Sequence, residues 1–113
     1  MKVVANVYEP MYDFNDKKYM RVLLSPNVAK KVSTIHDNKM HLLLNEHIDD
    51  PLDGRILKVK IPFRYRRVMC KVEGKPIQSL LKDDEVELEI DFKGAWNVDK
   101  YSGFSWVLVS CSA

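Results

Sequence analysis

An unbroken alternation of acidic and apolar residues occupies positions 85–92, with the sequence Glu85-Val86-Glu87-Leu88-Glu89-Ile90-Asp91-Phe92. Side chains of a β-strand point alternately to opposite faces, so this stretch predicts a half-buried antiparallel strand with an acidic outer face. Residues 3–8 and 19–24 are rich in β-branched and aromatic side chains, and they predict a β-hairpin with a longish loop. Several short strands with turn signals favour a small barrel or sandwich.

One helix is expected among these strands. Ser25 can cap its N-terminus, Pro26 suits the first helical position, and the apolar residues of 28–35 share one helical face. The pair Asp37-Asn38 is expected to interrupt this pattern. The segment 40–44 fits a helix or a strand equally well, so the sequence leaves its structure open.

The second half of the chain is expected to be β-structure. After Gly54, three apolar residues alternate with Lys58 and Lys60, which predicts a strand with both lysines on its outer face. A further strand is expected over 66–72 and a final one over 104–111. The segment 93–103 is expected to be a loop with two glycine hinges, and Trp96 within it is expected to be partly exposed.

The composition is typical of one globular domain spanning residues 1–113, mainly β in class. Cys70 and Cys111 are too few for a disulfide framework, and we expect buried free thiols in a reducing, intracellular compartment. No apolar run approaches the ~18 residues that a membrane span needs, so no membrane association is expected.

No pattern of residues predicts catalysis. His36, His41 and His47 lack the spacing that places metal ligands on one helix face, and they are expected to be solvated. The sequence contains no nucleophile elbow, P-loop or dinucleotide fingerprint. We therefore expect a protein that is not an enzyme and that holds no cofactor or metal.

Positive charge is concentrated between Arg55 and Lys75, and it is densest at Arg64-Tyr65-Arg66-Arg67. Cations beside exposed rings suit single-stranded nucleic acid, because phosphates need the charge and bases can stack on the rings. The net charge of only +2 leaves an alternative open. The basic strands could instead pair with the acidic strand 85–92 across a sheet, which would neutralise part of the charge.

The segment 80–90, with Trp96 and the closing stretch 103–108, resembles the late strands of OB-fold single-stranded DNA-binding proteins from phages and large DNA viruses. The resemblance covers roughly residues 55–111. It implies an OB-like five-stranded barrel with a helical insert, which binds single-stranded nucleic acid without sequence preference, DNA in preference to RNA. The contacts that it implies are Lys58, Lys60, Arg64, Tyr65, Arg66, Arg67, Lys71 and Trp96.

A second hypothesis comes from another class of protein. Short strands with unpaired edges and sorted charges could bring two copies, or a copy and a partner, together. The chain would then be an assembly or protein-interaction module, a homo-oligomer for example, that binds no nucleic acid.

Overall fold

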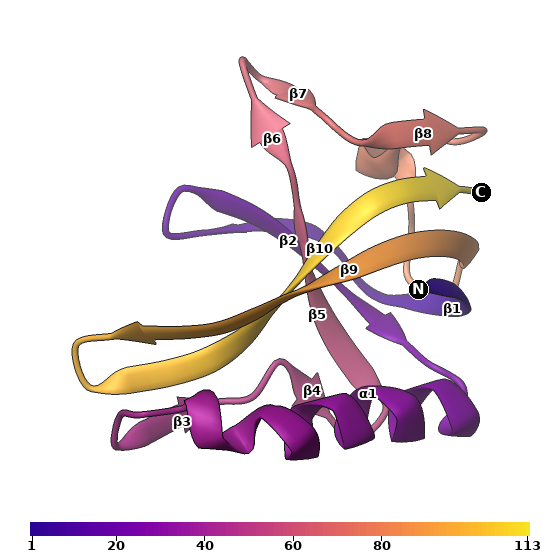
Figure 1. The fold of residues 1–113 in the computed structure, drawn as a ribbon. Coiled ribbons are helices and arrows are strands. Elements are labelled where there is room, and N and C mark those ends of the chain that lie inside the picture. The colour runs from indigo at the N-terminus through magenta and orange to yellow at the C-terminus, as the bar shows by residue number, and fades with distance from the viewer.

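Five strands pair in a closed ring in the computed structural model, which describes residues 1–113 (Figure 1). In chain order they are β1 (Lys2–Phe14), β2 (Lys17–Leu23), β5 (Ile56–Ile61), β9 (Glu85–Val98) and β10 (Tyr101–Ser112). Antiparallel pairing joins β1 to β2, β2 to β5, β1 to β9 and β9 to β10. A parallel contact between Lys60 and Val107 links β5 to β10 and closes the ring. The prediction of a mainly β fold with one helix is confirmed.

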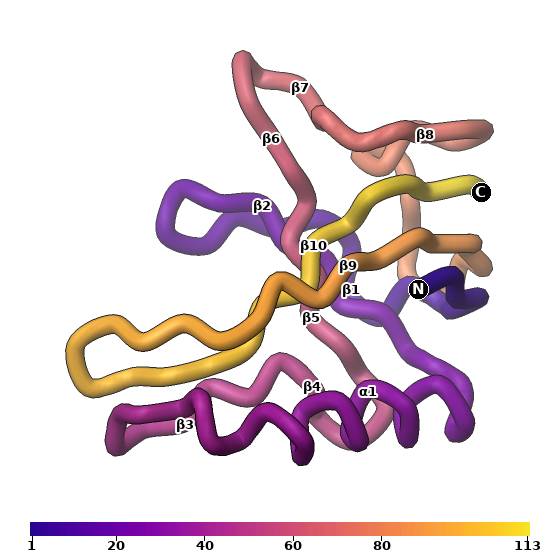
Figure 2. Tube along the Cα trace, viewed as in Figure 1, coloured from indigo at the N-terminus to yellow at the C-terminus, as the bar shows by residue number.

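Short elements surround the ring. They are α1 (Pro26–Lys39), η1 (Met40–Leu42), β3 (His47–Asp49), β4 (Leu52–Asp53), β6 (Phe63–Arg64), β7 (Arg67–Val68), β8 (Lys71–Glu73) and η2 (Ile77–Ser79). The strands β3 and β8 pair with β10, and β4 pairs with β5. The strands β6 and β7 form a separate two-stranded sheet, which projects away from the ring in Figure 2.

The helix α1 begins where the sequence predicts. The backbone N–H of Val28 donates to Ser25 Oγ at 3.3 Å, and Pro26 opens the first turn. The helix continues to Lys39, so the interruption expected at Asp37-Asn38 is wrong; both side chains are exposed, and nothing in the packing ends the helix there. In Figure 1 the helix lies across one end of the ring. No helix of the structure combines the length and the apolar character that crossing a membrane would require.

Alternating apolar side chains from every strand of the ring fill its interior. The strand predicted at 85–92 is confirmed, with Val86, Leu88 and Ile90 buried and Glu85 and Glu87 exposed. Nineteen buried residues form one core cluster, to which α1 contributes Ala29 and Val32 and the η2 region contributes Ile77 and Leu80. Burial of this apolar surface is the main stabilising force, at about 25 cal/mol per Å².

Two connections are tighter than the sequence predicts. The turn between β1 and β2 is the two residues Asn15-Asp16, with φ of 50° and 62°, where a longish loop was expected. Positive φ at both positions is the geometry of a type I′ turn, which matches the twist of the strands. The expected loop 93–103 is likewise wrong, because β9 continues to Val98 and only Asp99-Lys100 separates it from β10. Gly94, with φ of 94°, lies at a bulge in this long hairpin.

The basic segment differs most from expectation. The stretch 66–72 is not the single strand that the sequence predicts, because it is divided between β7 and β8. The chain turns at Tyr65-Arg66, with φ of 53° and 62°, and pairs β6 with β7. The alternative left open by the sequence, that basic strands pair with the acidic strand, does not hold for β5, since β9 pairs with β1 and β10. The acidic row therefore does not neutralise Lys58 and Lys60.

His36 is buried, which corrects the expectation of a solvated side chain. Its ring stacks on Phe104, with centroids 4.5 Å apart, and its Nε2 accepts a hydrogen bond from Trp106 Nε1–H at 2.9 Å. An accepting Nε2 means that the neutral ring carries its proton on Nδ1, which faces Asp50 Oδ1 3.4 Å away. Burial lowers the pKa of His36, and the nearby charges of Asp50 and Asp37 offset this only in part.

Candidate functional site

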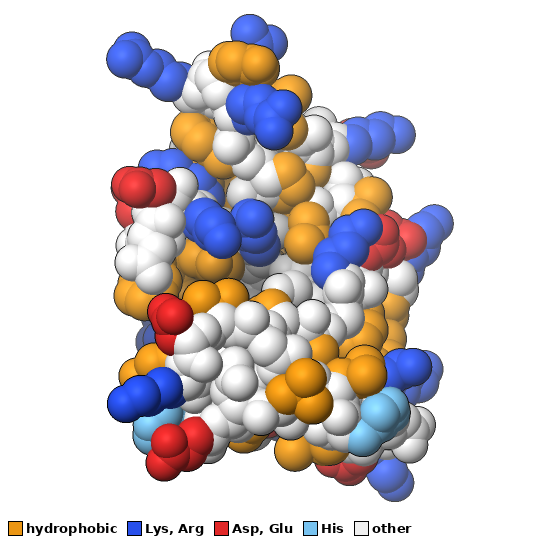
Figure 3. Space-filling view, turned by 60° about the vertical axis from the view of Figure 1, so that its left-hand side comes forward, with side chains coloured by type: hydrophobic (Ala, Val, Ile, Leu, Met, Phe, Trp, Pro, Cys, Tyr) orange, Lys and Arg blue, Asp and Glu red, His pale blue; other side chains and the backbone are white.

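A cleft of about 310 Å³ opens between the tips of the β1–β2 and β9–β10 hairpins. We call it the hairpin cleft. Figure 3 looks at the side of the molecule on which the two tips lie, and Lys and Arg side chains gather on the upper half of that face. The cleft is lined by Phe14, Asn15, Lys17, Tyr19, Asp49, Lys58, Lys60, Trp96, Val98, Phe104, Ser105 and Trp106.

Three lysines converge on the hairpin cleft from neighbouring strands. Lys17 and Tyr19 come from β2, and the register of β2 with β5 places Tyr19 directly opposite Lys60. Lys58 Nζ lies 5.1 Å from the centre of the Tyr19 ring and 3.7 Å from Asp49 Oδ2. Neither Lys17 nor Lys60 takes part in an ion pair. Their charges are therefore available to an anionic ligand.

Trp96 forms the aromatic wall of the cleft. It is the cross-strand partner of Gly103, and its indole lies directly over that glycine. A Cβ atom on Gly103 would lie 2.6 Å from Trp96 Cζ2 and 2.6 Å from the carbonyl oxygen of Asp49. The missing side chain thus leaves the space over β10 in which the indole lies.

A polar network fixes the hairpin that carries Trp96. The Ser102 hydroxyl, which is buried, donates to Asn97 Oδ1 and accepts the backbone N–H of Asn45 at 2.8 Å. Asn97 Oδ1 also accepts the backbone N–H of Leu44 at 2.9 Å. Asn45 Nδ2 donates to the carbonyl of Tyr101 at 2.8 Å. These bonds tie the segment after η1 to the hairpin tip, so the tip is held before any ligand arrives.

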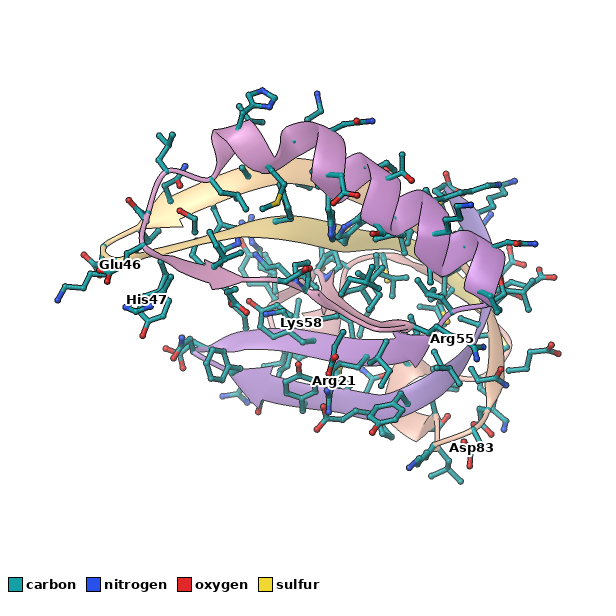
Figure 4. The ribbon with its side chains drawn as sticks, turned by 90° about the horizontal axis from the view of Figure 1, so that it is seen from below. Arg21, Glu46, His47, Arg55, Lys58 and Asp83 are labelled. Carbon is teal, nitrogen blue, oxygen red and sulfur yellow. The ribbon has the colours of Figure 1, made fainter.

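Acidic side chains gather on the α1 side of the hairpin cleft. A second depression, which shares Asp49 and Lys58 with the cleft, holds four carboxylates, those of Glu9, Asp49, Asp50 and Asp53. Arg21 lies opposite Lys58 in the sheet, and both are labelled in Figure 4. The Arg21 Nε donates to Glu9 Oε1 at 2.7 Å, and this bond raises the pKa of the guanidinium. Burial raises the pKa of Tyr19, and Asp49 acts in the same direction, so its hydroxyl stays protonated.

The eight residues predicted for the site fall into three groups. Lys58, Lys60 and Trp96 lie together in the hairpin cleft. Arg64, Tyr65, Arg66 and Arg67 lie on the β6–β7 hairpin. Lys71 lies elsewhere, in a cleft of about 410 Å³ that Glu87 and Glu89 also line.

Sequence reasoning missed Lys17 and Tyr19. The short turn Asn15-Asp16 fixes the register of β1 with β2, but it gives no information on the register of β2 with β5. The pairing of β2 with β5 then aligns Tyr19 with Lys60 across a separation of 41 positions in the chain. That pairing follows from the tertiary fold and has no local signature.

Two further observations concern metal ligands and the cysteines. No group of three or more His, Cys, Asp or Glu side chains is placed to hold a metal ion. Burial raises the pKa of Cys111 to about 11 and also raises that of Cys70, so neither sulfur is an activated thiolate at neutral pH. Comparison with protein-family models, with curated proteins and with solved structures finds no match for this chain.

Proposed function

We propose that this protein binds single-stranded nucleic acid in the hairpin cleft, without sequence preference and without catalysing a reaction. The observation that carries the proposal is the convergence of Lys17, Lys58 and Lys60 with the rings of Tyr19 and Trp96 in one cleft. Cations along a groove neutralise phosphates, and aromatic faces stack bases of any kind. DNA is the form favoured by the resemblance to phage and viral single-strand binders.

We also propose that the ring is an OB-like barrel, an architecture that fits the binding of nucleic acid. OB folds have five strands and bind oligonucleotides on the face of their second and third strands, between the first and the last hairpin loops. In this chain the second and third strands of the ring are β2 and β5. The hairpin cleft lies on their outer face, and Asn15 from the first hairpin and Val98 from the last both line it.

The binding of labelled oligo-dT, followed by fluorescence anisotropy across a salt series, tests the proposal. Neutralising two phosphates of a single strand, one at Lys17 and one at Lys60, gives a slope of log affinity against log salt of about −1.4. The double variant Lys17→Gln/Lys60→Gln should make the slope less steep by about 1.4 and weaken binding. Lys30→Gln/Lys31→Gln on the exposed face of α1 removes the same charge as a control, and it should leave the slope unchanged. Micromolar or weaker binding with a flat slope for the unmodified protein would refute the proposal.

A further inference from the structure

The β6–β7 hairpin, residues 63–68, is an exposed basic feature of the molecule. We call it the arm. The Tyr65 side chain at its turn is 80% exposed, and the three arginines around it are exposed too. None of them takes part in an ion pair or a side-chain hydrogen bond with the rest of the protein. Three cations held together on a two-stranded hairpin without counter-charges favour an anionic partner.

The arm is a direct continuation of the hairpin cleft. The chain leaves β5 one residue after Lys60 and enters β6 after Pro62, and Figure 1 shows β6 continuing the course of β5. At the base of the arm, Lys18 Nζ pairs with Asp13 and lies 4.9 Å from the centre of the Phe63 ring. The chain thus runs directly from Lys60 of the cleft to Tyr65 and the arginines of the arm.

The end of the cleft on the α1 side, away from the arm, is unfavourable to phosphates. There the four carboxylates of the acidic depression, Glu9, Asp49, Asp50 and Asp53, face only the cations Arg21 and Lys58. Arg21 is already bound to Glu9, and Lys58 lies beside Asp49. Like charges repel a polyanion, so a strand that occupies the cleft leaves it away from α1.

We propose that a single strand bound in the hairpin cleft runs on toward the arm, and that Arg64, Arg66 and Arg67 contact its phosphates while Tyr65 stacks a base. This inference rests on the proposed function and specifies the ligand as a strand long enough to reach both places. Five residues of extended chain separate Lys60 from the turn of the arm, or about 16 Å. That distance is roughly five phosphate spacings of a stacked strand.

The length dependence of binding tests the proposal. The probes are a 4-nucleotide and a 16-nucleotide oligo-dT, which bracket the roughly 4–16 nucleotides that OB folds bind. The arm variant is Arg64→Gln/Arg66→Asn/Arg67→Gln, with asparagine at Arg66 because this residue has a φ of 62°, which asparagine tolerates. Quenching of tryptophan fluorescence reports occupancy of the cleft for both probes, because Trp96 and Trp106 both line it, and light scattering reports the oligomeric state.

The arm variant should bind the long probe about tenfold more weakly, with a salt slope less steep by about 2, and should bind the short probe as the unmodified protein does. The control variant Lys30→Gln/Lys31→Gln/Lys39→Gln removes the same charge from α1 and should leave both affinities unchanged. An equal loss of affinity for both probes, or no loss of affinity for the long probe, would overturn the proposal. So would a change in oligomeric state of the free arm variant, because the arm would then join copies of the chain. If the unmodified protein bound neither probe, the proposed function itself would fail.

Discussion

Replacing Gly103 with alanine is expected to weaken the binding of oligo-dT by about 5- to 150-fold, the loss that corresponds to one stacked base. The new Cβ atom would lie 2.6 Å from both the Trp96 indole and the Asp49 carbonyl oxygen. The indole can move aside as a side chain, whereas the contact with the carbonyl oxygen is relieved only if β3 shifts against β10, so some loss of stability is expected as well. A displaced indole no longer forms the wall of the cleft. Gly103 is in this sense a positioning residue.

A double-mutant cycle separates an effect on the position of the Trp96 indole from a general loss of stability. In a Trp96→Ala background the Gly103→Ala change should weaken binding less than it does in the unmodified protein, because there is no indole left to displace and only the contact with the Asp49 carbonyl oxygen remains. Acrylamide should quench Trp96 more strongly in Gly103→Ala, and this readout needs no nucleic acid. Ser112→Thr adds a methyl group to the same strand far from Trp96 and serves as the control. Equal losses of affinity with and without Trp96 would show that Gly103 matters only for stability.

The second large effect is expected at His36. Changing it to phenylalanine keeps a ring for stacking on Phe104 but removes the acceptor of the Trp106 N–H, which is buried. An unsatisfied buried donor costs about 1–3 kcal/mol of stability. His36→Gln, which keeps an acceptor, should lose less. Urea unfolding of the two variants measures the difference, and equal stabilities would contradict this account of the bond.

The lowered pKa of His36 predicts that the stability of the protein depends on pH. Its pKa is lowered in the folded protein, so below about pH 6.5 the unfolded chain takes up a proton that folded His36 resists. The stability that the neutral ring provides is therefore complete above that pH and is lost as the pH falls. Unfolding free energies at pH 5 and pH 8 should differ less in His36→Gln than in the unmodified protein. His41→Gln, at an exposed position, should keep the full difference.

The sequence allowed accurate prediction where local physical chemistry decides the structure. Strict alternation located the first half of β9, and the Ser25-Pro26 pair located the start of α1. Prediction failed where pairing overrides local pattern. The residues after Phe92 lack alternation and contain Gly94, yet β10 holds them in a strand through a bulge. Tyr65 and Arg66 are not typical residues at positive φ, and the turn between them had no signal.

For the candidate site, too, local pattern could be read from the sequence and tertiary pairing could not. Lys58 and Lys60 could be predicted because their apolar neighbours point into the core, and Trp96 because its surroundings are polar. Lys71 was grouped with these residues because of its charge. It lies in another cleft, because β8 pairs with β10 near its C-terminal end. Tyr19 and Lys17 reach the site only through the register of β2 with β5, which the sequence does not reveal.

Closure of the ring has a kinetic consequence. Both β1 and β5 pair with β2. Their other edges, at Lys2 opposite Glu89 and at Lys60 opposite Val107, stay unpaired until β9 and β10 have formed. Contacts so distant along the chain slow folding, and we expect refolding times of milliseconds to seconds. During that interval the open edges of β1 and β5 can pair with other chains. The yield of refolded protein should therefore fall as its concentration rises, with the loss confined to the time before the last hairpin docks.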